Sequence, residues 1–159
     1  MTMQIRNATP QDVPEILRLI RALADYEKLS HEVLATEERL RKSLFGPRPA
    51  AETVLAWLDG GAIGFAVFFP NYSTFRGCAG LYLEDLFVEP AQRGRGYGKA
   101  LLLHVARLAV ERGCERMEWS VLDWNAPAIE FYRELGAHPF DDWTIYRLQG
   151  EALKQAVSG

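Results

Sequence analysis

Residues 93–99 read RGRGYGK, and they lie between an apolar run at 81–88 and a longer run with helical spacing that starts near residue 98. Glycines allow positive φ, so the backbone amides of such a turn can converge on one point, and the N-terminus of a following helix adds partial positive charge. Together with the three cations of the stretch, these features predict an anion-binding turn whose ligand is a phosphate. A surface loop rich in Arg and Gly, without a ligand, is the alternative that this stretch alone leaves open.

Two common nucleotide motifs do not fit this turn. A P-loop requires Ser or Thr after Gly-Lys to hold magnesium, whereas Ala100 follows Lys99. A dinucleotide fingerprint requires the spacing G-x-G-x-x-G and an acidic residue at the end of a second strand, and neither is present. The expected ligand is therefore a pyrophosphate that is held without a metal.

Composition predicts one globular domain that covers residues 1–159. Of the 159 residues 48% are hydrophobic, which is enough for a sizeable core, and no repeat or composition break marks a linker. The formal net charge of −3 argues against nucleic acid as the main partner, because basic residues do not outnumber acidic ones. Two cysteines, no basic-then-apolar leader and no apolar run of membrane-spanning length predict a cytoplasmic protein without a membrane partner.

Strand and helix patterns are mixed along the chain, which indicates an α/β (α+β) protein. We expect strands at 3–7, 52–58, 62–69, 81–88, 116–121 and 143–148. We expect helices at 9–27, 36–45, 98–112, 125–135 and 151–157, with residues 70–80 as a loop.

Two adjacent carboxylates, Glu84 and Asp85, lie on the apolar strand at 81–88. Such groups are costly to bury unless each has a partner or takes part in a reaction. Regular alternation places Asp85 on the face of Leu81 and Leu83, opposite to Glu84, so Asp85 is expected to be structural unless a bulge changes the alternation. Glu84 is the candidate general base, with a structural acid as its alternative role.

The order of these elements resembles the GNAT superfamily of acetyl-CoA-dependent N-acetyltransferases, whose R-x-x-G-x-G turn is matched by Arg93, Gly96 and Gly98. The sequences YLED at 82–85, WNAP at 124–127 and FY at 131–132, with LADYE at 23–27, are similar to the spermidine/spermine (diamine) N-acetyltransferase branch. The resemblance covers nearly the whole chain. It implies the GNAT fold, a central mixed and mostly antiparallel sheet flanked by helices.

The resemblance also implies acetyl-CoA as the co-substrate, no metal, and a homodimer. In the family, backbone amides at the end of the central strand hold the thioester carbonyl, and the glycine turn holds the pyrophosphate. The positions that this assigns to acetyl-CoA are Leu86, Phe87, Val88, Arg93, Gly94, Arg95, Gly96, Tyr97, Gly98, Lys99, Asn125, Ala126, Pro127, Ala128 and Tyr132. Aromatic residues Phe68, Phe69, Tyr72 and Phe75 are expected to supply apolar surface for the dimer.

The chemistry requires a base, because an alkyl ammonium with a pKa of about 10.4 holds only about one free amine in a thousand at neutral pH. Glu84 is expected to accept this proton directly or through water, and Tyr132 matches the family's tyrosine that protonates the departing thiolate. For Tyr132, packing against coenzyme A without an acid role is the alternative. The expected substrate contacts are Tyr26, Glu27, Glu84, Glu118 and Trp119.

The identity of the amine stays open. A polyamine or diamine is the first expectation, but Lys28 adds a cation directly after Glu27, where a polycation would have to lie. A smaller or zwitterionic amine such as a lysine analogue is the alternative substrate. An acyl-CoA-binding module without turnover is the alternative from another class of function.

Overall fold

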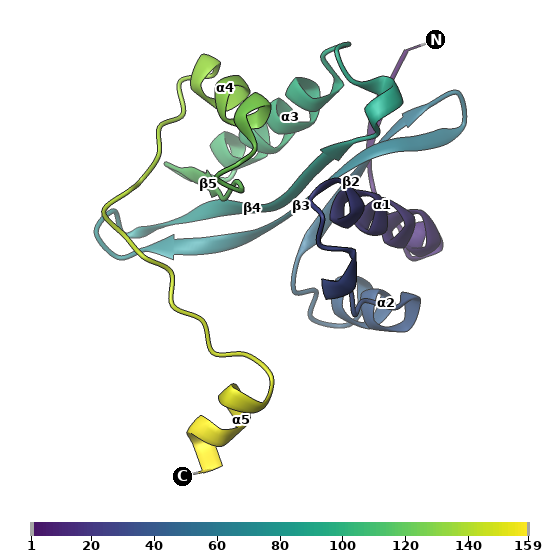
Figure 1. Ribbon diagram of the computed structural model, residues 1–159. Coiled ribbons are helices and arrows are strands. Elements are labelled where there is room, and N and C mark those ends of the chain that lie inside the picture. The colour runs from purple at the N-terminus through teal and green to yellow at the C-terminus, as the bar shows by residue number, and fades with distance from the viewer. Residues whose placement is uncertain (1, 159) are drawn as a thin grey trace. The chain divides into compact units, whose positions relative to one another are not determined.

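The computed structural model describes residues 2–158 (Figure 1). These residues form two compact units, one that runs to Ser120 and one that starts at Val121. The single domain expected from composition therefore stays a prediction.

The first unit is built on a five-stranded sheet in the order β1-β2-β3-β4-β5. The strands are β1 (Gln4–Asn7), β2 (Glu52–Leu58), β3 (Gly61–Ser73), β4 (Cys78–Val88) and β5 (Met117–Trp119). The first three pairings are antiparallel and the β4–β5 pairing is parallel. This confirms the expected mixed, mostly antiparallel sheet.

The β3–β4 hairpin is longer than the sequence pattern indicates. Residues 70–73 of β3 pair with residues 78–81 of β4, so only residues 74–77 form the turn. The expectation of a loop over 70–80 is wrong. Pro70 and Asn71 are poor strand formers by themselves, but strand propensity depends on the neighbouring strand, which here pairs with both residues.

Three α-helices belong to this unit: α1 (Val13–Tyr26), α2 (Glu37–Phe45) and α3 (Tyr97–Glu111). A short 3-10 turn, η1 (Pro10–Asp12), precedes α1, and the amide of Thr9 donates to the Asp12 carboxylate at 2.8 Å. At the start of α2, Thr36 Oγ1 accepts from the Arg39 amide at 3.1 Å. Thr36 therefore satisfies a backbone donor as an N-terminal cap, whereas at Thr9 the Asp12 carboxylate accepts from the backbone donor.

The core lies on both faces of the sheet. On one face, Phe65 and Phe87 are fully buried against Ile16 and Leu19 of α1. On the other face, Leu83 and its neighbours lie under α3, which packs on β3 and β4. The central strand β4 is thus covered from both sides, as its two apolar faces predict.

The second unit contains α4 (Ala126–Glu134) and α5 (Glu151–Ser158). Asn125 caps α4, because its Oδ1 accepts from the Ala128 amide at 3.4 Å. The strand expected at 143–148 is not formed, so that prediction is wrong. The segment is rich in β-branched and aromatic residues, but no strand among residues 2–158 pairs with it, and a strand requires a partner for its backbone groups.

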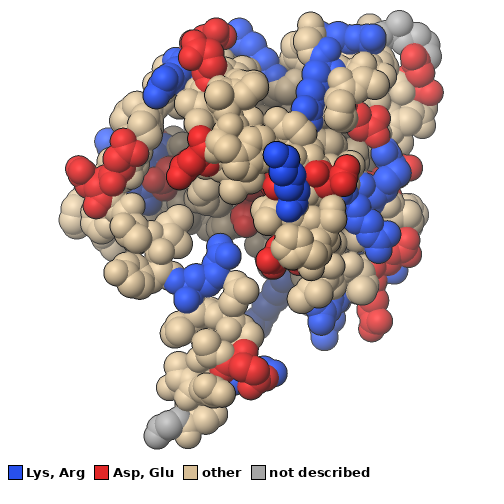
Figure 2. Space-filling view, viewed as in Figure 1, with Lys and Arg blue, Asp and Glu red and all other residues tan. Residues whose placement is uncertain are grey.

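Charged side chains are interspersed on the face of the molecule that Figure 2 shows, with acidic and basic groups side by side. Among residues 2–158, no helix combines the length and the apolar character that crossing a bilayer requires.

Candidate active site

Strand β4 carries a β-bulge at Glu84. Val67 of β3 lies opposite Asp85, whereas the next residue, Phe68, lies opposite Leu83. Glu84 therefore has no partner residue on β3, and its side chain is exposed. An extra residue of this kind shifts the alternation of side chains beyond it.

The bulge places Asp85 on the sheet face that α1 covers. Phe65, Val67 and Phe69 alternate along β3 and so share one face, and the residues opposite them on β4 are Phe87, Asp85 and Tyr82. Phe65 and Val67 belong to the core cluster of α1, and the Phe69 ring lies 5.3 Å from that of Tyr82. The expectation that Asp85 shares a face with Leu81 and Leu83 is wrong, because the sequence pattern assumes a regular strand.

Two more carboxylates act on Asp85. Its pKa is raised to about 7, chiefly by burial and then by the negative charges of Glu84 and Glu27. Glu27 follows the last residue of α1, and partial burial raises its pKa as well. Among residues 2–158, none of the three carboxylates has a hydrogen bond or a salt bridge with a cation. A cationic ligand would relieve the repulsion between them.

The edge of β4 that follows Leu83 is open on the side of β5. Strand β5 pairs with β4 only at Leu81, Tyr82 and Leu83. From Glu84 to Val88, the backbone groups that point to this side have no partner strand among the described residues. These groups include donors of the kind that hold a thioester carbonyl, where the resemblance assigns Leu86, Phe87 and Val88.

The glycine turn leads directly into α3. Gly94 has φ 78° and Gly96 has φ 82°, both in the left-handed region that favours glycine. Gly96 is the N-cap of α3, no side chain caps the helix, and the first amides of the helix are left for an external acceptor. An added Cβ at Gly94 or Gly96 would meet nothing within 4 Å, so the space above the turn is open. The turn thus has the backbone geometry of an anion site.

The cations of the turn differ in their contacts. Arg95 hydrogen-bonds Gln92 at 3.1 Å, and Lys99 is exposed on the first turn of α3. Arg93 instead donates from Nε to the Val88 carbonyl oxygen at 2.9 Å, and its guanidinium lies 4.3 Å from the ring centre of Tyr26. The structure therefore brings together Tyr26, the glycine turn and the end of β4.

Strand β5 carries two further predicted contacts. Glu118 lies opposite Tyr82, where it pairs with Arg116 at 3.2 Å and accepts from the Asn71 amide nitrogen at 3.1 Å. Trp119 lies opposite Leu83. Glu118 is thus already engaged by neighbours, and a role for either residue in binding the amine stays a prediction.

The remaining predicted residues lie in the second unit. Asn125, Ala126, Pro127 and Ala128 form the start of α4, and Tyr132 lies near its end, with its ring 5.4 Å from that of Phe131. Their roles toward acetyl-CoA stay predictions. Among residues 2–158, no group of three His, Cys, Asp or Glu side chains could hold a metal ion.

Sequence reasoning did not group Asp85 with the candidate site residues. The adjacent pair Glu84-Asp85 was the available signal, because two neighbouring carboxylates on an apolar strand require an explanation. Alternation assigned only one of them to the site. The bulge brings Asp85 under the influence of both Glu84 and Glu27.

Known proteins resemble this chain over most of its length. Residues 16–137 match the model of the Acetyltransferase (GNAT) family. The chain is 35% identical to L-ornithine N5-acetyltransferase NATA1 of Arabidopsis thaliana, over 97% of this chain and 87% of that protein. It is 37% identical to thialysine N-epsilon-acetyltransferase of Bos taurus, over 96% of each. An integron cassette protein from the mobile metagenome of V. cholerae shares the fold, with a TM-score of 0.84 at 23% identity over 100% of this chain and 99% of that one.

Proposed function

The chain belongs to the acetyltransferase (GNAT) family, and from this premise we propose that it moves the acetyl group of acetyl-CoA to a primary amine of a small cationic molecule such as a polyamine or diamine. The choice of a cationic amine rests on the cluster of three carboxylates formed by Glu27, Glu84 and Asp85. These side chains have no cationic partner among residues 2–158, and Asp85 is held near a pKa of about 7. A bound ammonium would supply the missing positive charge.

The first step is removal of a proton from the ammonium. Freeing the amine at pH 7 from a pKa of about 10.4 costs on the order of 4 kcal/mol. We keep Glu84 as the proposed acceptor and add Asp85 as a second candidate, because a base with a pKa near the working pH is well matched to proton transfer. The exposed position of Glu84 allows transfer through a water.

The free amine then attacks the thioester carbonyl in a ternary complex. The nitrogen forms the new C–N bond, and the carbonyl oxygen becomes negative in the tetrahedral intermediate. Open backbone donors between Leu86 and Val88 would stabilise this oxygen, typically by about 3 kcal/mol for each donor. When the C–S bond breaks, the proposed proton donor to the thiolate is the phenol of Tyr132. The nitrogen loses its second proton as the amide forms, and a proton from the solvent restores the phenol.

A basic amino acid is the second candidate substrate, and the relatives named for ornithine and thialysine favour it. Such a substrate has a carboxylate as well as an ammonium, so it needs a cation near the acidic group. Lys28 follows Glu27 directly and has φ 62°. A polyamine would be repelled by this cation, whereas the carboxylate of an amino acid would be attracted.

A thiol-release assay tests the proposal with polyamines, diamines, ornithine, thialysine and aminoglycosides as acceptors. We expect release of coenzyme A with at least one polyamine or diamine, well above the rate for acetyl-CoA alone. Higher kcat/KM for ornithine or thialysine would select the second candidate. Release no faster than hydrolysis for every amine in the panel would contradict the proposal.

We also propose a homodimer and a cytoplasmic location. Phe75 and Tyr72, at the tip of the β3–β4 hairpin, are 99% and 62% exposed and supply apolar surface. Phe68 does not, because it is 1% exposed, so its expected place in the interface is wrong. Sedimentation at micromolar concentration tests the dimer, and an 18.0 kDa species would contradict it.

A further inference from the structure

The side chain of Arg93 is fixed by three contacts that lead away from the glycine turn. Its Nε donates to the Val88 carbonyl oxygen at 2.9 Å. Its guanidinium carbon lies 4.3 Å from the ring centre of Tyr26 and 5.4 Å from that of Phe87, within the range of cation–π attraction. One residue of the turn therefore contacts both the end of β4 and the end of α1.

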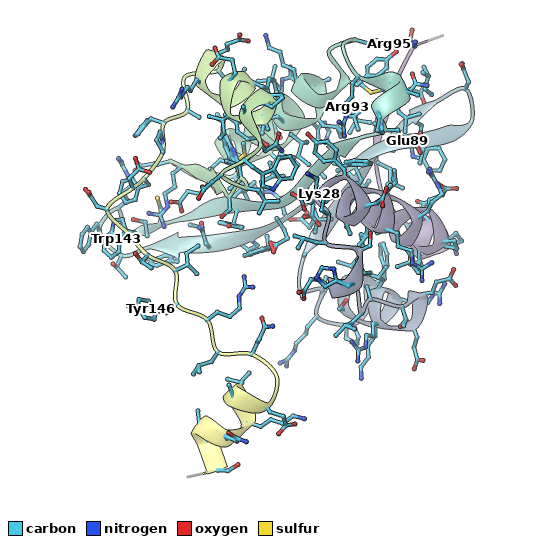
Figure 3. All side chains as sticks on the ribbon, viewed as in Figure 1. Lys28, Glu89, Arg93, Arg95, Trp143 and Tyr146 are labelled. Carbon is cyan, nitrogen blue, oxygen red and sulfur yellow. The ribbon has the colours of Figure 1, made fainter. Side chains whose placement is uncertain are left out.

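Arg93 is unlike the neighbouring cation Arg95. Arg95 donates a hydrogen bond to Gln92, which precedes the turn, whereas Arg93 has no salt bridge with any carboxylate among residues 2–158. In the view of Figure 3, Arg93 lies between Arg95 and Lys28, which follows the end of α1. The guanidinium of Arg93 thus contacts two aromatic rings and a carbonyl oxygen. These contacts connect the glycine turn with the end of α1 and the end of β4.

The contact of Arg93 with Tyr26 supports the end of α1, where the backbone conformation is unusual. The helix ends at Tyr26 and Glu27, and the backbone then enters the left-handed region at Lys28, with φ 62°. A residue other than glycine rarely adopts this conformation, and it persists where surrounding contacts support it. The position of Glu27, whose charge acts on Asp85, therefore depends on how this helix end is held.

We infer that Arg93 is a positioning residue that fixes the Tyr26-Glu27 end of α1 against the glycine turn and thereby sets the amine-binding side of the site. Its guanidinium acts through the Tyr26 ring and the Val88 carbonyl, and the charge that attracts the anion comes from Arg95, Lys99 and the backbone amides. The kinetic test of this role rests on the proposed acetyltransferase function.

Arg93→Lys is the most direct variant, because it keeps the positive charge and loses the planar guanidinium with its Nε donor. We expect the KM for the amine to rise about fivefold, the effect of a contact of ordinary cation–π strength. The affinity for acetyl-CoA should stay within about twofold of wild type. The matched control Arg41→Lys, at an exposed residue of α2 outside the site, should change neither constant by more than about twofold.

Arg93→Gln separates positioning from charge. If Arg93 acted by its charge on the anion, this variant would weaken acetyl-CoA binding strongly at low salt and little at high salt, and Arg93→Lys would be nearly silent. That pattern would overturn the inference. We expect instead that Arg93→Gln resembles Arg93→Lys, with the larger change in the KM for the amine.

A double-mutant cycle with Tyr26→Leu tests the route through the ring. In the Tyr26→Leu background, Arg93→Gln should have little further effect on the KM for the amine, because the contact is already lost. Additive effects would overturn the inference. The two residues could instead be coupled in thermal stability while the KM for the amine stays unchanged. This result would show a purely structural contact and would also overturn the inference.

Hydrogen exchange supplies a readout that does not need turnover. In the absence of substrates, Arg93→Gln should speed exchange of the amides at 24–29, where Leu29 donates to the Ala24 carbonyl oxygen at 2.8 Å, and Arg95→Gln should not. Unchanged exchange at 24–29 would overturn the inference even if the enzyme is active. If no amine is acetylated but exchange does change, the proposed substrate class fails and the positioning of α1 by Arg93 stands.

Discussion

The carboxylate cluster of Glu27, Glu84 and Asp85 and the glycine turn before α3 are built in opposite ways. The cluster consists of side chains, and burial with mutual repulsion raises the pKa of Asp85 to about 7. The turn consists of backbone amides, with Gly94 and Gly96 at positive φ. A side-chain site depends on single functional groups, whereas a backbone site shares its donors among several residues. Single substitutions should therefore affect the carboxylate cluster more than the turn.

The largest effect is expected at the carboxylates. Glu84→Gln should lower kcat/KM by roughly 10² to 10⁴ at pH 7, the usual size of a general-base contribution, and Asp85→Asn should do so if Asp85 accepts the proton instead. The loss should shrink at high pH, where free amine forms without help from the protein. Glu115→Gln, a change of the same type at an exposed salt bridge with Arg76, is the control. Near-wild-type activity of both carboxylate variants would mean that the proton leaves by another route.

A smaller effect is expected for the proton that the departing thiolate receives, which we assign to Tyr132. Tyr132→Phe should lower kcat by about tenfold, with acetyl-CoA affinity within about twofold, because only the phenol is lost. The help is moderate because a thiol has a pKa of about 8.5 and leaves readily as a thiolate. Tyr146→Phe, at a residue 93% exposed, is the matched control. A kcat within about twofold of wild type would assign Tyr132 to packing.

Gly96→Ala tests the backbone construction of the turn. At φ 82° a Cβ costs roughly 1–2 kcal/mol, although it would meet no atom within 4 Å, so the change acts through the backbone conformation. We expect acetyl-CoA to bind about tenfold more weakly by calorimetry, with the amine KM little changed. The control is Gly61→Ala, at a glycine without positive φ that is the first residue of β3. Full affinity of Gly96→Ala would argue that the conformation of Gly96 is unimportant for the anion.

Removal of side-chain charge from the turn should have a smaller effect. The variant with both Arg95→Gln and Lys99→Gln should weaken acetyl-CoA binding by about fivefold at 50 mM salt and by less at 500 mM, because exposed charges are screened. Calorimetry at the two salt concentrations measures this difference. A loss larger than that of Gly96→Ala would reverse the comparison and make the turn a site built from side chains.

The last prediction concerns stability. Folding raises the pKa of Asp85 from 3.8 to about 7. The contribution of Asp85 to the free energy of unfolding is therefore fully present below pH 4 and is lost as the pH rises through 7. Asp85→Asn removes this dependence, so the variant should be more stable than wild type by about 4 kcal/mol at pH 8, or about 10 °C in Tm. The difference should vanish near pH 4. Equal Tm values at pH 8 would show that Asp85 is ionised without cost in the folded protein.

Sequence reasoning succeeds for helix starts, which depend on nearby residues, and fails at two segments whose structure depends on pairing with another strand. The helix starts near Thr9, Thr36 and Asn125 and the start of α3 at the glycine turn follow from residues close in the chain, and the structure has these helices. The expected strand at 143–148 and the loop at 70–80 are wrong, because pairing with another strand decides whether such residues become a strand. The long hairpin has its partner, and residues 143–148 have none among residues 2–158.

The sequence by itself determined the family, the glycine turn and the helix that follows it, because glycine conformation, capping and helical periodicity act over a few residues. Tertiary structure alone decided the side of the sheet to which Asp85 belongs and the direction of the Arg93 side chain. The extra residue at Glu84 is visible only when β4 is paired with β3, since both alternations look regular when each strand is read separately. Arg93 contacts Tyr26, which lies 67 positions earlier in the chain, because folding places the end of α1 beside the end of β4.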